Sequence, residues 1–450
     1  MWALNAWQRS LAGSNRHSHD NWAGGCIAMA TVALLSAHHG SDGPEPWGSL
    51  RVGGISIIER QMRQAMSAGA TRAILKVESE SPELLAAIEQ AGQWLTVANT
   101  GAALADAIGA DDVLLFAEGL VIDDRIVRRM MAFDGAALAV WSGDAPAEAE
   151  RIDHATCWAG MARIPAEIVT EASLALGEWD MQSTLLRVTA AMAPARLEMG
   201  GIDLYAPDRG RDVPLLWLAV RSPTAAQTSM DALLQSTEIG GSIWVSRFIQ
   251  SPAANMLTRW LSPGRISPVL LRILTTAAGL IAGVAFATGW LAVGLCLALS
   301  VGVLGTVASK LAQVRVEAAK SSQQWAMFDQ VIGYAWYLCL GGWVGGSAWL
   351  LAAMIILFSW AADNQRKFFN QVTGRLLHDS GAFEQRLSLV VSHRDTLLWL
   401  LIPFAWLGLW FAGLALLATY AGLTFFVTQA RVFHRLIGSV AIDSHSGQSG

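Results

Sequence analysis

The chain has few charged residues for its length. Asp, Glu, Lys and Arg make up 15% of its 450 residues, whereas soluble domains average about 25%. The shortage is local, because residues 1–265 have an ordinary density of charge and residues 266–430 contain long runs without any. A purely soluble protein is therefore excluded, and the C-terminal part is expected to lie in a membrane.

Cysteines and excess basic charge are also scarce. The four cysteines, Cys26, Cys157, Cys296 and Cys339, form no Cys-x-x-Cys pair, so no disulfide framework or zinc site is predicted. The net charge of −5 argues against a nucleic-acid partner. Residues 1–21 lack the apolar core of a signal peptide, so the N-terminal part is expected to stay in the cytoplasm.

Apolar runs dominate the C-terminal part of the sequence. A membrane-spanning helix needs roughly 18 or more apolar residues. One run is too long for a single helix and is expected to break near residues 410–413. The resulting prediction is six spans, formed by residues 269–288, 291–308, 331–345 and 348–361 and by the two parts of 396–427.

The distribution of basic residues supports six spans with both ends in the cytoplasm. If the N-terminus is inside, the three outer turns contain no charged residue. The inner segments then hold ten arginines and lysines, which is the positive-inside pattern. These residues are Lys310, Arg315, Lys320, Arg366, Lys367, Arg375, Arg386, Arg394, Arg431 and Arg435.

The N-terminal part alternates short aliphatic strands with amphipathic helical stretches. Strands are predicted at residues 27–36, 73–77, 112–116 and 136–141, and helices at 56–68, 82–91 and 124–133. This alternation predicts an α/β fold with a mostly parallel sheet. A ligand of such a fold is expected at the carboxyl ends of the strands.

Three segments resemble sugar-nucleotide nucleotidyltransferases, which have a GT-A-like fold. Residues 51–70 (RVGGISIIERQMRQAMSAGA) are similar to the "V-x-G-x-P-L-I-x-R…AG" stretch that follows the phosphate loop of that family. Residues 112–123 resemble the strand that leads to its metal-binding aspartate, and residues 157–165 resemble a later strand. The resemblance implies a nucleotidyltransferase-like α/β domain.

The sequence departs from that family where the nucleotide would bind. The loop after the first strand reads SAHHGSDG and has no arginine. The metal-binding aspartate falls at about Gly119, with Glu118 and Asp123 on either side. His38, His39, Glu118 and Asp123 are therefore the candidate nucleotide-binding residues. The two histidines are alternatively ordinary loop residues, and the domain is alternatively a docking module that performs no nucleotidyl transfer.

The C-terminal part resembles the membrane domain of CDP-alcohol phosphatidyltransferases, which some enzymes fuse to a nucleotidyltransferase. That family has an amphipathic helix before its first span, and residues 246–260 fit it, with Arg247 and Arg259 as cations that reach the lipid headgroups. Its signature reads D-x2-D-G-x2-A-R-x8/9-G-x3-D-x3-D. The resemblance implies that three aspartates hold two divalent cations, Mg²⁺ or Mn²⁺, while a fourth takes a proton from the attacking alcohol.

One of the four signature aspartates is present. Asp329 stands at the third metal-ligand position, which makes it the candidate catalytic and metal-binding residue. Gly333 occupies the general-base position, and residues 306–310 contain no carboxylate. A lone carboxylate cannot hold two divalent cations. Asp329 is alternatively a charge at a helix start that faces Lys310 or Arg315.

Three basic residues near this motif have two interpretations. Lys310, Arg315 and Lys320 are candidates for binding a phosphate or an anionic lipid headgroup. They alternatively do no more than satisfy the positive-inside rule.

The sequence thus predicts an α/β nucleotidyltransferase-like domain followed by an all-α polytopic membrane domain of about six transmembrane helices. Two functions stay open: phospho-group transfer from a CDP-alcohol in phospholipid or related lipid biosynthesis through an altered site, or an inactive descendant that binds lipid, nucleotide or a partner. The protein is expected to lie in the lipid bilayer of the inner (cytoplasmic) membrane. Its expected ligand is a CDP-alcohol or a lipid alcohol, and a homodimer is expected to form through the membrane domain. A transporter is a third class with little support. The predicted segments are an extension (1–26), the α/β domain (27–240), a juxtamembrane helix (241–265), the membrane domain (266–430) and a tail (431–450).

Overall fold

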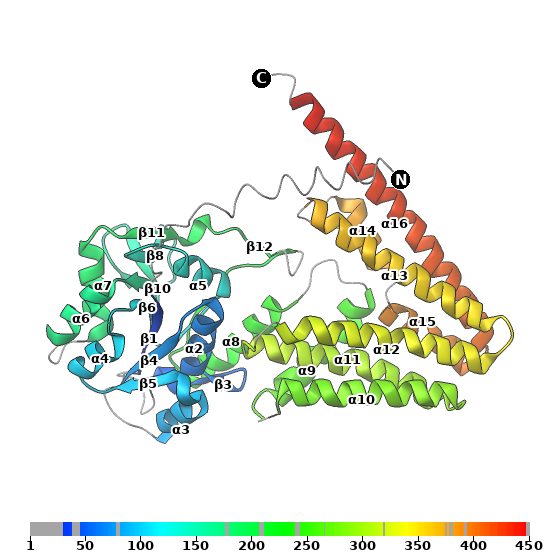
Figure 1. Ribbon diagram of the computed structural model, residues 1–450, viewed down its shortest axis with the longest axis horizontal. Helices are drawn as coiled ribbons and strands as arrows, with labels where there is room; N and C mark the ends of the chain where they lie inside the picture. The colour runs from blue at the N-terminus through cyan, green and yellow to red at the C-terminus, as the bar shows by residue number, and fades with distance from the viewer. Residues whose placement is uncertain are drawn as a thin grey trace.

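The protein consists of an α/β domain and a helical domain that meet side by side (Figure 1). It is described here from a computed structural model. The structure describes residues 30–37, 46–77, 82–175, 180–206, 211–238, 244–264, 266–317, 320–373, 376–377, 381–390 and 394–446.

The α/β domain is built on one large sheet in the strand order β11-β8-β10-β6-β1-β4-β5. All neighbours on this path are parallel except β10, which runs antiparallel to both β6 and β8. The predicted α/β class with a mostly parallel sheet is confirmed. The strands are β1 (Thr31–Ala37), β4 (Arg72–Val77), β5 (Leu95–Ala98), β6 (Asp112–Phe116), β8 (Ala137–Ser142), β9 (Glu150–Arg151, paired with β10), β10 (Thr156–Ile164) and β11 (Ala195–Glu198).

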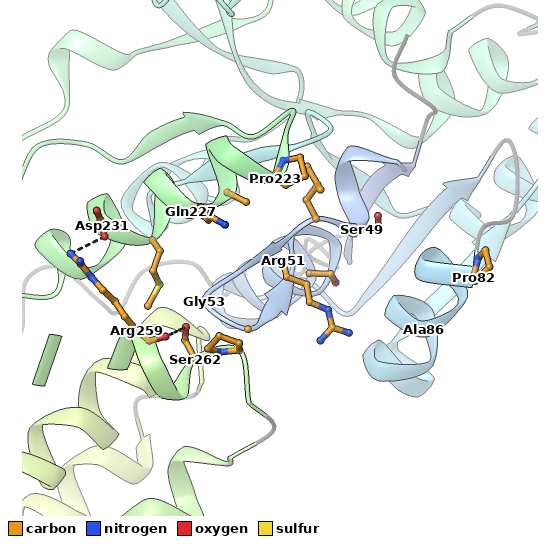
Figure 2. Close-up of a pocket in the computed structure, with 16 residues that line it drawn as sticks. Ser49, Arg51, Gly53, Pro82, Ala86, Pro223, Gln227, Asp231, Arg259 and Ser262 are labelled. Carbon is orange, nitrogen blue, oxygen red and sulfur yellow. Dashed lines mark hydrogen bonds and ion pairs between the residues drawn. The ribbon is translucent and has the colours of Figure 1, made fainter. Parts of the chain in front are cut away.

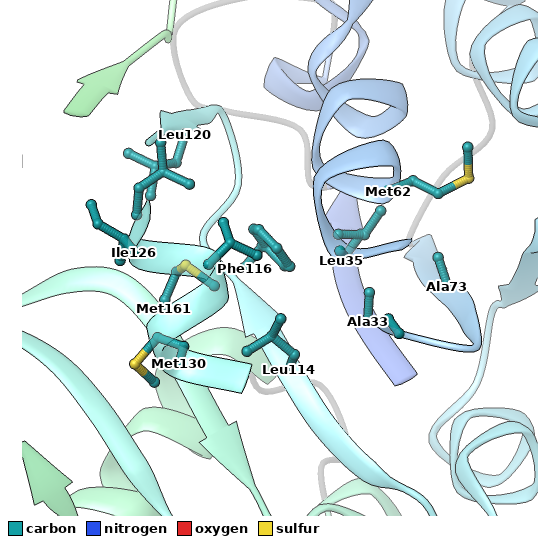
Figure 3. Packing of buried hydrophobic residues seen from close by; sticks show 14 of the residues in the cluster. Ala33, Leu35, Met62, Ala73, Leu114, Phe116, Leu120, Ile126, Met130 and Met161 are labelled. Atoms are coloured by element: carbon teal, nitrogen blue, oxygen red, sulfur yellow. The ribbon is translucent and has the colours of Figure 1, made fainter. Parts of the chain in front are cut away.

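Helices cover both faces of this sheet, because alternate residues of a strand point to opposite sides. Ala33 and Leu35 of β1 belong to a core under α2 (Ile57–Ala68) and α5 (Asp124–Met131) (Figure 3). Val32 and Leu34 belong to a second core on the other face. That face is covered by α4 (Gly101–Ile108), α6 (Ala166–Ala175) and α7 (Met181–Ala191).

Helix α2 shows how local sequence sets an element. Ser56 is its N-cap and accepts a hydrogen bond from the N–H of Glu59 at 3.2 Å. Gly69 ends the helix with φ of 114°, a left-handed conformation that favours glycine. The predicted helix at residues 56–68 is confirmed, as is α3 (Pro82–Ala91).

Shorter elements sit beside the main sheet. A two-residue turn, Gly53-Gly54, joins β2 (Arg51–Val52) to β3 (Ile55–Ser56). Helix α8 (Pro223–Ser236) packs against this hairpin and leads toward the helical domain. The remaining pairs are β7 (Leu120–Ile122) with β14 (Trp217–Ala219) and β12 (Tyr205–Ala206) with β13 (Arg211–Asp212).

The helical domain contains a helix for each predicted apolar run. Helix α10 packs on α11 and α12, α13 packs on α16, and α15 contacts both α11 and α16. From the juxtamembrane segment on, the elements in chain order are a π-helical turn (Ser246–Gln250), α9 (Ser251–Leu261), α10 (Pro268–Ala287), α11 (Leu291–Val314), α12 (Lys320–Val344), α13 (Ala348–Thr373), α14 (Ala382–Val390), α15 (Arg394–Trp406) and α16 (Trp410–Ser446).

Three of the described helices are long and apolar enough to cross a membrane: residues 268–287, 291–314 and 410–435. The prediction of about six spans is therefore supported for three, by length and composition. Residues 396–406 form a shorter apolar helix. The last run does break into two helices, α15 and α16, but the turn lies at residues 407–409, just before the predicted 410–413, which are the first residues of α16.

Helix α14 is held to α16 by a buried ion-pair cluster. The side chain of Glu384 is fully buried and accepts hydrogen bonds from Arg435 Nε (3.0 Å) and Arg431 Nε (3.1 Å). Bonds from Arg435 and then Arg431 outweigh the effect of burial and lower the pKa of Glu384 to about 2. This carboxylate therefore stays ionised at neutral pH.

Candidate functional site

Asp329 lies where three helices of the membrane domain meet. Its Oδ2 atom is 3.0 Å from Nη1 of Arg272 in α10, and both side chains are largely buried. The same guanidinium donates through Nη2 to the hydroxyl of Ser309 in α11. A buried ion pair thus ties α10 to α12, and its guanidinium also holds α11. We call Arg272, Ser309 and Asp329 the junction triad.

A second polar group continues from the triad toward α13. Gln330 Nε2 donates to Tyr334 at 3.0 Å and to Oδ2 of Asp363 at 3.1 Å, and Asp363 is also paired with Arg366. Each carboxylate in this region therefore has a cation beside it. Ionisable groups inside a helix bundle usually serve a function or stabilise a defined packing.

The junction does not fit a pair of divalent cations. Within the described part of the chain, no three His, Cys, Asp or Glu side chains gather closely enough to hold a metal ion. Residue 309, in the segment where the resemblance places two metal aspartates, is a serine that binds Arg272. Gly333 lies one turn after Asp329 and has no side chain to act as a base. No chemical step through Mg²⁺ or Mn²⁺ follows from these residues.

Asp329 has a partner that the sequence interpretation did not name. The two alternatives for Asp329 were a metal-bound carboxylate and a charge facing Lys310 or Arg315. The ion pair that the structure shows is with Arg272. Arg272 had a usable signal in the sequence, because it is an arginine inside the apolar run 269–288, and such residues are rare in membrane helices unless they face a partner.

Lys310 joins α11 to the juxtamembrane helix. Its ammonium group donates to Ser251 Oγ at 2.9 Å and to Asn255 Oδ1 at 2.6 Å, and the side chain is buried. Phosphate binding by Lys310 stays a prediction. Lys320 begins α12, and its side chain lies outside the described residues.

Arg315 holds the end of α11 to the loop before α10 and reaches the α/β domain through one longer contact. Its guanidinium donates to the carbonyls of Ile266 (2.7 Å) and Gly264 (2.8 Å), with longer contacts to Ser262 (3.2 Å) and Gly53 (3.4 Å). All four acceptors are backbone carbonyls, and the residue is buried. Its observed partners thus give Arg315 a docking role, and its predicted role as a phosphate ligand stays untested.

Two arginines of α2 bind the C-terminal end of α11. Arg60 donates to the carbonyl of Val314, and Arg63 donates to that of Arg315 at 2.7 Å. The last carbonyls of a helix have no partner within it and carry the negative end of its dipole, so cations stabilise them. Burial lowers the pKa of Arg60 to about 10. Arg60 therefore remains charged at neutral pH and caps α11 from the other domain.

The Gly53-Gly54 turn fits closely against the same helix end. A Cβ on Gly53 would lie 2.2 Å from Val314 Cγ1, and one on Gly54 would lie 1.9 Å from the carbonyl oxygen of Ser262. The side chain of Val314 belongs to a core cluster of the α/β domain. The segment at 51–70 that resembles nucleotidyltransferases therefore supplies the contact between the domains, which we call the domain junction.

Two of the four candidate nucleotide residues, Glu118 and Asp123, lie in the described part of the structure. Glu118 follows β6, and its N–H donates to Gln182 Oε1 at 3.0 Å. Because β6 ends at Phe116 and β7 begins at Leu120, Glu118 lies in the turn between the two strands. His38 and His39 lie outside the described residues.

Asp123 has a structural environment. It caps α5 and accepts hydrogen bonds from the N–H and Nε of Arg125 at 2.9 and 3.0 Å. Burial alone would raise the pKa of Asp123, but the hydrogen bonds from Arg125 outweigh burial and hold it below its usual value. The guanidinium of Arg125 also binds the carbonyl of Val213 at 2.9 Å, so this pair fixes the chain around β13.

The position of the missing metal aspartate is closed by packing. Gly119 has φ of 66°, and a Cβ there would lie 2.8 Å from the carbonyl oxygen of Val220 and 3.1 Å from Trp47 Cβ. The guanidinium of Arg221 lies 5.0 Å from the centre of the Trp47 ring. A carboxylate therefore cannot be placed at residue 119 without moving the backbone.

A large cavity adjoins the domain junction (Figure 2). Its volume is about 810 Å³, and both domains contribute to its walls. Arg51 of β2 extends toward the space between Ala86 of α3 and Ser262 after α9. The sequence reasoning did not identify this site, because its walls come from segments far apart in the chain.

Comparisons with known proteins are limited to solved structures, since no protein-family model and no curated protein matches the chain. UTP-bound UGPase from Acinetobacter baumannii is 14% identical over 45% of this chain and 92% of its own, with a TM-score of 0.30. UDP-glucose pyrophosphorylase from the same organism is 13% identical over 52% and 98%, with a TM-score of 0.32. A UDP-glucose pyrophosphorylase complexed with UDP-glucose is 11% identical over 46% and 99%, also at 0.32. At these values no conclusion about the site or the activity rests on the similarity.

Proposed function

We propose that this protein is a membrane-bound, non-catalytic relative of enzymes that join a nucleotidyltransferase-like domain to a CDP-alcohol phosphatidyltransferase domain. It acts as a binding or partner subunit at the membrane. The junction triad is the observation that carries this proposal. The guanidinium of Arg272 supplies positive charge beside Asp329, and Mg²⁺ or Mn²⁺ would supply that charge in the enzymes.

The domain junction supports the same proposal. Arg60, in the segment 51–70 that resembles nucleotidyltransferases, donates to the carbonyl of Val314 in the membrane domain, and Arg315 donates to the carbonyls of Ile266 and Gly264 and, at 3.4 Å, to that of Gly53 in the α/β domain. Residues that bind backbone in this way stabilise the arrangement of two domains. A binding or partner subunit requires a fixed arrangement of its domains and does not require a metal site.

The test is binding of CDP and of a CDP-alcohol to the full-length protein in detergent, with and without Mg²⁺ or Mn²⁺. We expect no metal-dependent binding, and we expect Asp329→Asn to lower thermal stability because Arg272 loses its buried counter-ion. Arg187→Gln, at an exposed position of α7, is the matched control. Metal-dependent binding that disappears in Asp329→Asn would overturn the proposal.

Phospho-group transfer from a CDP-alcohol in phospholipid or related lipid biosynthesis is the second candidate. Its support is that Asp329 stands one turn before Gly333 on α12, in the place that the resemblance gives to a metal ligand. The same binding experiment separates the two candidates. A homodimer and a lipid-alcohol ligand remain predictions that go with this second candidate.

We also propose that α12, α13 and α15 cross the membrane together with the three longer apolar helices. The protein would then be a six-span protein of the inner (cytoplasmic) membrane with both ends in the cytoplasm. The turns at 288–290, 345–347 and 407–409 contain no charged residue. The ion pairs at Asp329, Asp363 and Glu384 involve residues near the opposite helix ends.

Cysteine labelling tests this topology. In a variant without the native cysteines, a cysteine at Ser347 should react with a membrane-impermeant maleimide in intact cells, and one at Asn370 should react only after lysis. The two positions are at opposite ends of α13, so each controls for the other. The reverse result, or equal labelling of both positions, would contradict six spans with inner termini.

A further inference from the structure

The cavity at the domain junction has the composition of a site for an amphiphile. It is bounded by the β2–β3 hairpin, α3, α8 and the end of α9. Most of the exposed lining is apolar, with Leu50, Ala86, Ala226 and Met230 among the wall residues. Small-molecule pockets usually measure roughly 300–1,000 Å³ and combine apolar walls with a few placed polar groups. The volume of about 810 Å³ lies in that range.

Arg51 is the cation that this cavity offers to a ligand. Its side chain is exposed and extends between α3 and the turn at Ser262 (Figure 2). Among the described residues, none forms a hydrogen bond or an ion pair with it. The other arginine of the lining, Arg259, is paired with Asp231 at 2.8 Å. A phosphate or carboxylate in the cavity would therefore meet the guanidinium of Arg51, which is suited to a two-pronged contact with such groups.

The juxtamembrane segment places this cavity beside lipid. Arg259 lines the cavity, whereas Trp260 and Met256 of the same helix are 78% and 68% exposed. Phe248, in the π-helical turn before α9, is 69% exposed. Exposed large apolar side chains with flanking arginines are typical of a helix that lies in a membrane interface. One side of this segment thus faces lipid while another forms a wall of the cavity.

We propose that the cavity binds a single-chain anionic amphiphile. Its phosphate or carboxylate head binds Arg51, and its hydrocarbon chain lies against the apolar wall that includes Leu50, Ala86 and Met230. This site is separate from the junction triad and does not depend on whether metal-dependent transfer has been lost. Both domains form its walls, so occupation by a lipid would favour the docked arrangement of the two domains.

The probe for this proposal is radiolabelled dodecyl phosphate. Its equilibrium binding is measured on the full-length protein in a neutral maltoside detergent. We expect Arg51→Gln to weaken binding at least tenfold, because the head loses its charged contact. Ala86→Trp should weaken it similarly by filling the space for the chain. Arg247→Gln should leave binding unchanged. Arg247 is exposed, as Arg51 is, but it lies in the juxtamembrane segment and does not line the cavity.

Two competitors distinguish the sources of the anionic head. Dodecanol and inorganic phosphate should each compete poorly with dodecyl phosphate, since each offers one part of the amphiphile. Inorganic phosphate that competes as well as unlabelled dodecyl phosphate would identify a free anion site and overturn the proposal. Wild-type affinity in both Arg51→Gln and Ala86→Trp would overturn it too. Circular dichroism of each variant shows that a loss of binding does not come from unfolding.

Discussion

Replacement of Arg315 by methionine tests how the end of α11 is held beside the domain junction. Methionine keeps the apolar stem of the side chain and removes the guanidinium. The two shortest contacts of that guanidinium are 2.7 Å to Ile266 and 2.8 Å to Gly264. A hydrogen bond from a charged group contributes about 1.5–3 kcal/mol. The loss of two such bonds is therefore expected to cost about 3–6 kcal/mol, and the longer contacts would add a smaller amount.

Ile266 and Gly264 belong to the loop before α10, so the cost should appear mainly as opening of the contact between that loop and the end of α11; the longer contact to Gly53 is the one that crosses to the α/β domain. A change of that size raises the population of the open state roughly 10²- to 10⁴-fold, at 1.36 kcal/mol per factor of ten. Hydrogen exchange measured by mass spectrometry should therefore become faster in peptides from the end of α9, the start of α10 and the end of α11, with a smaller increase in the β2–β3 hairpin. Peptides from β8 and β11, at the far side of the sheet, should exchange as in the wild type.

Two further variants make the result interpretable. Arg315→Lys retains the charge but not the planar fork, so it should give an intermediate effect. Arg187→Met removes an exposed arginine from α7 and should change nothing at the junction. If Arg315→Met leaves exchange unchanged while it abolishes phosphate binding, Arg315 is a ligand-binding residue and the docking role assigned here is wrong.

Three more substitutions test other contacts. In a denaturation series, Gly54→Ala should lower the free energy of unfolding by about 1–3 kcal/mol more than Gly135→Ala. Both glycines have positive φ, but of the two only residue 54 would bring a Cβ against a carbonyl oxygen, at 1.9 Å. Equal effects would show that the close contact is not important. Arg272→Met alone should cost about 3–5 kcal/mol by thermal unfolding, whereas adding Asp329→Leu should recover most of the loss, since replacing both members of a buried pair is often neutral. Glu384 has a pKa lowered to about 2, so its stabilisation is present above its unfolded pKa and is lost as the pH falls from about 5 toward 2. In Glu384→Gln the stability of the α14–α16 contact, followed by hydrogen exchange, should lose this part of its pH dependence, and an unchanged acid profile would contradict the assignment.

The sequence by itself determined the α/β class of the first domain and part of its elements, whereas strands such as β5 and β11 and helices such as α4, α6 and α7 were not predicted. The short aliphatic run that contains Val32 and Ala33 is typical of a strand buried on both faces, and Ser56 and Gly69 mark the ends of α2. These features depend on neighbours within a few residues, so the spacing of residue types along the chain is enough to predict them. The break between α15 and α16 was predictable from length, since the apolar run is longer than one helix needs to cross a bilayer.

Only the tertiary structure decided what the charged residues bind. Arg60 contacts a carbonyl 254 positions away in the sequence, and Arg272 and Asp329 are 57 positions apart. The resemblance to catalytic motifs predicted a metal ligand at Asp329 and a phosphate ligand at Arg315. The observed partners are backbone carbonyls and a neighbouring guanidinium. No local pattern specifies such a partner, because the energy of a buried charge depends on whichever group the fold brings beside it.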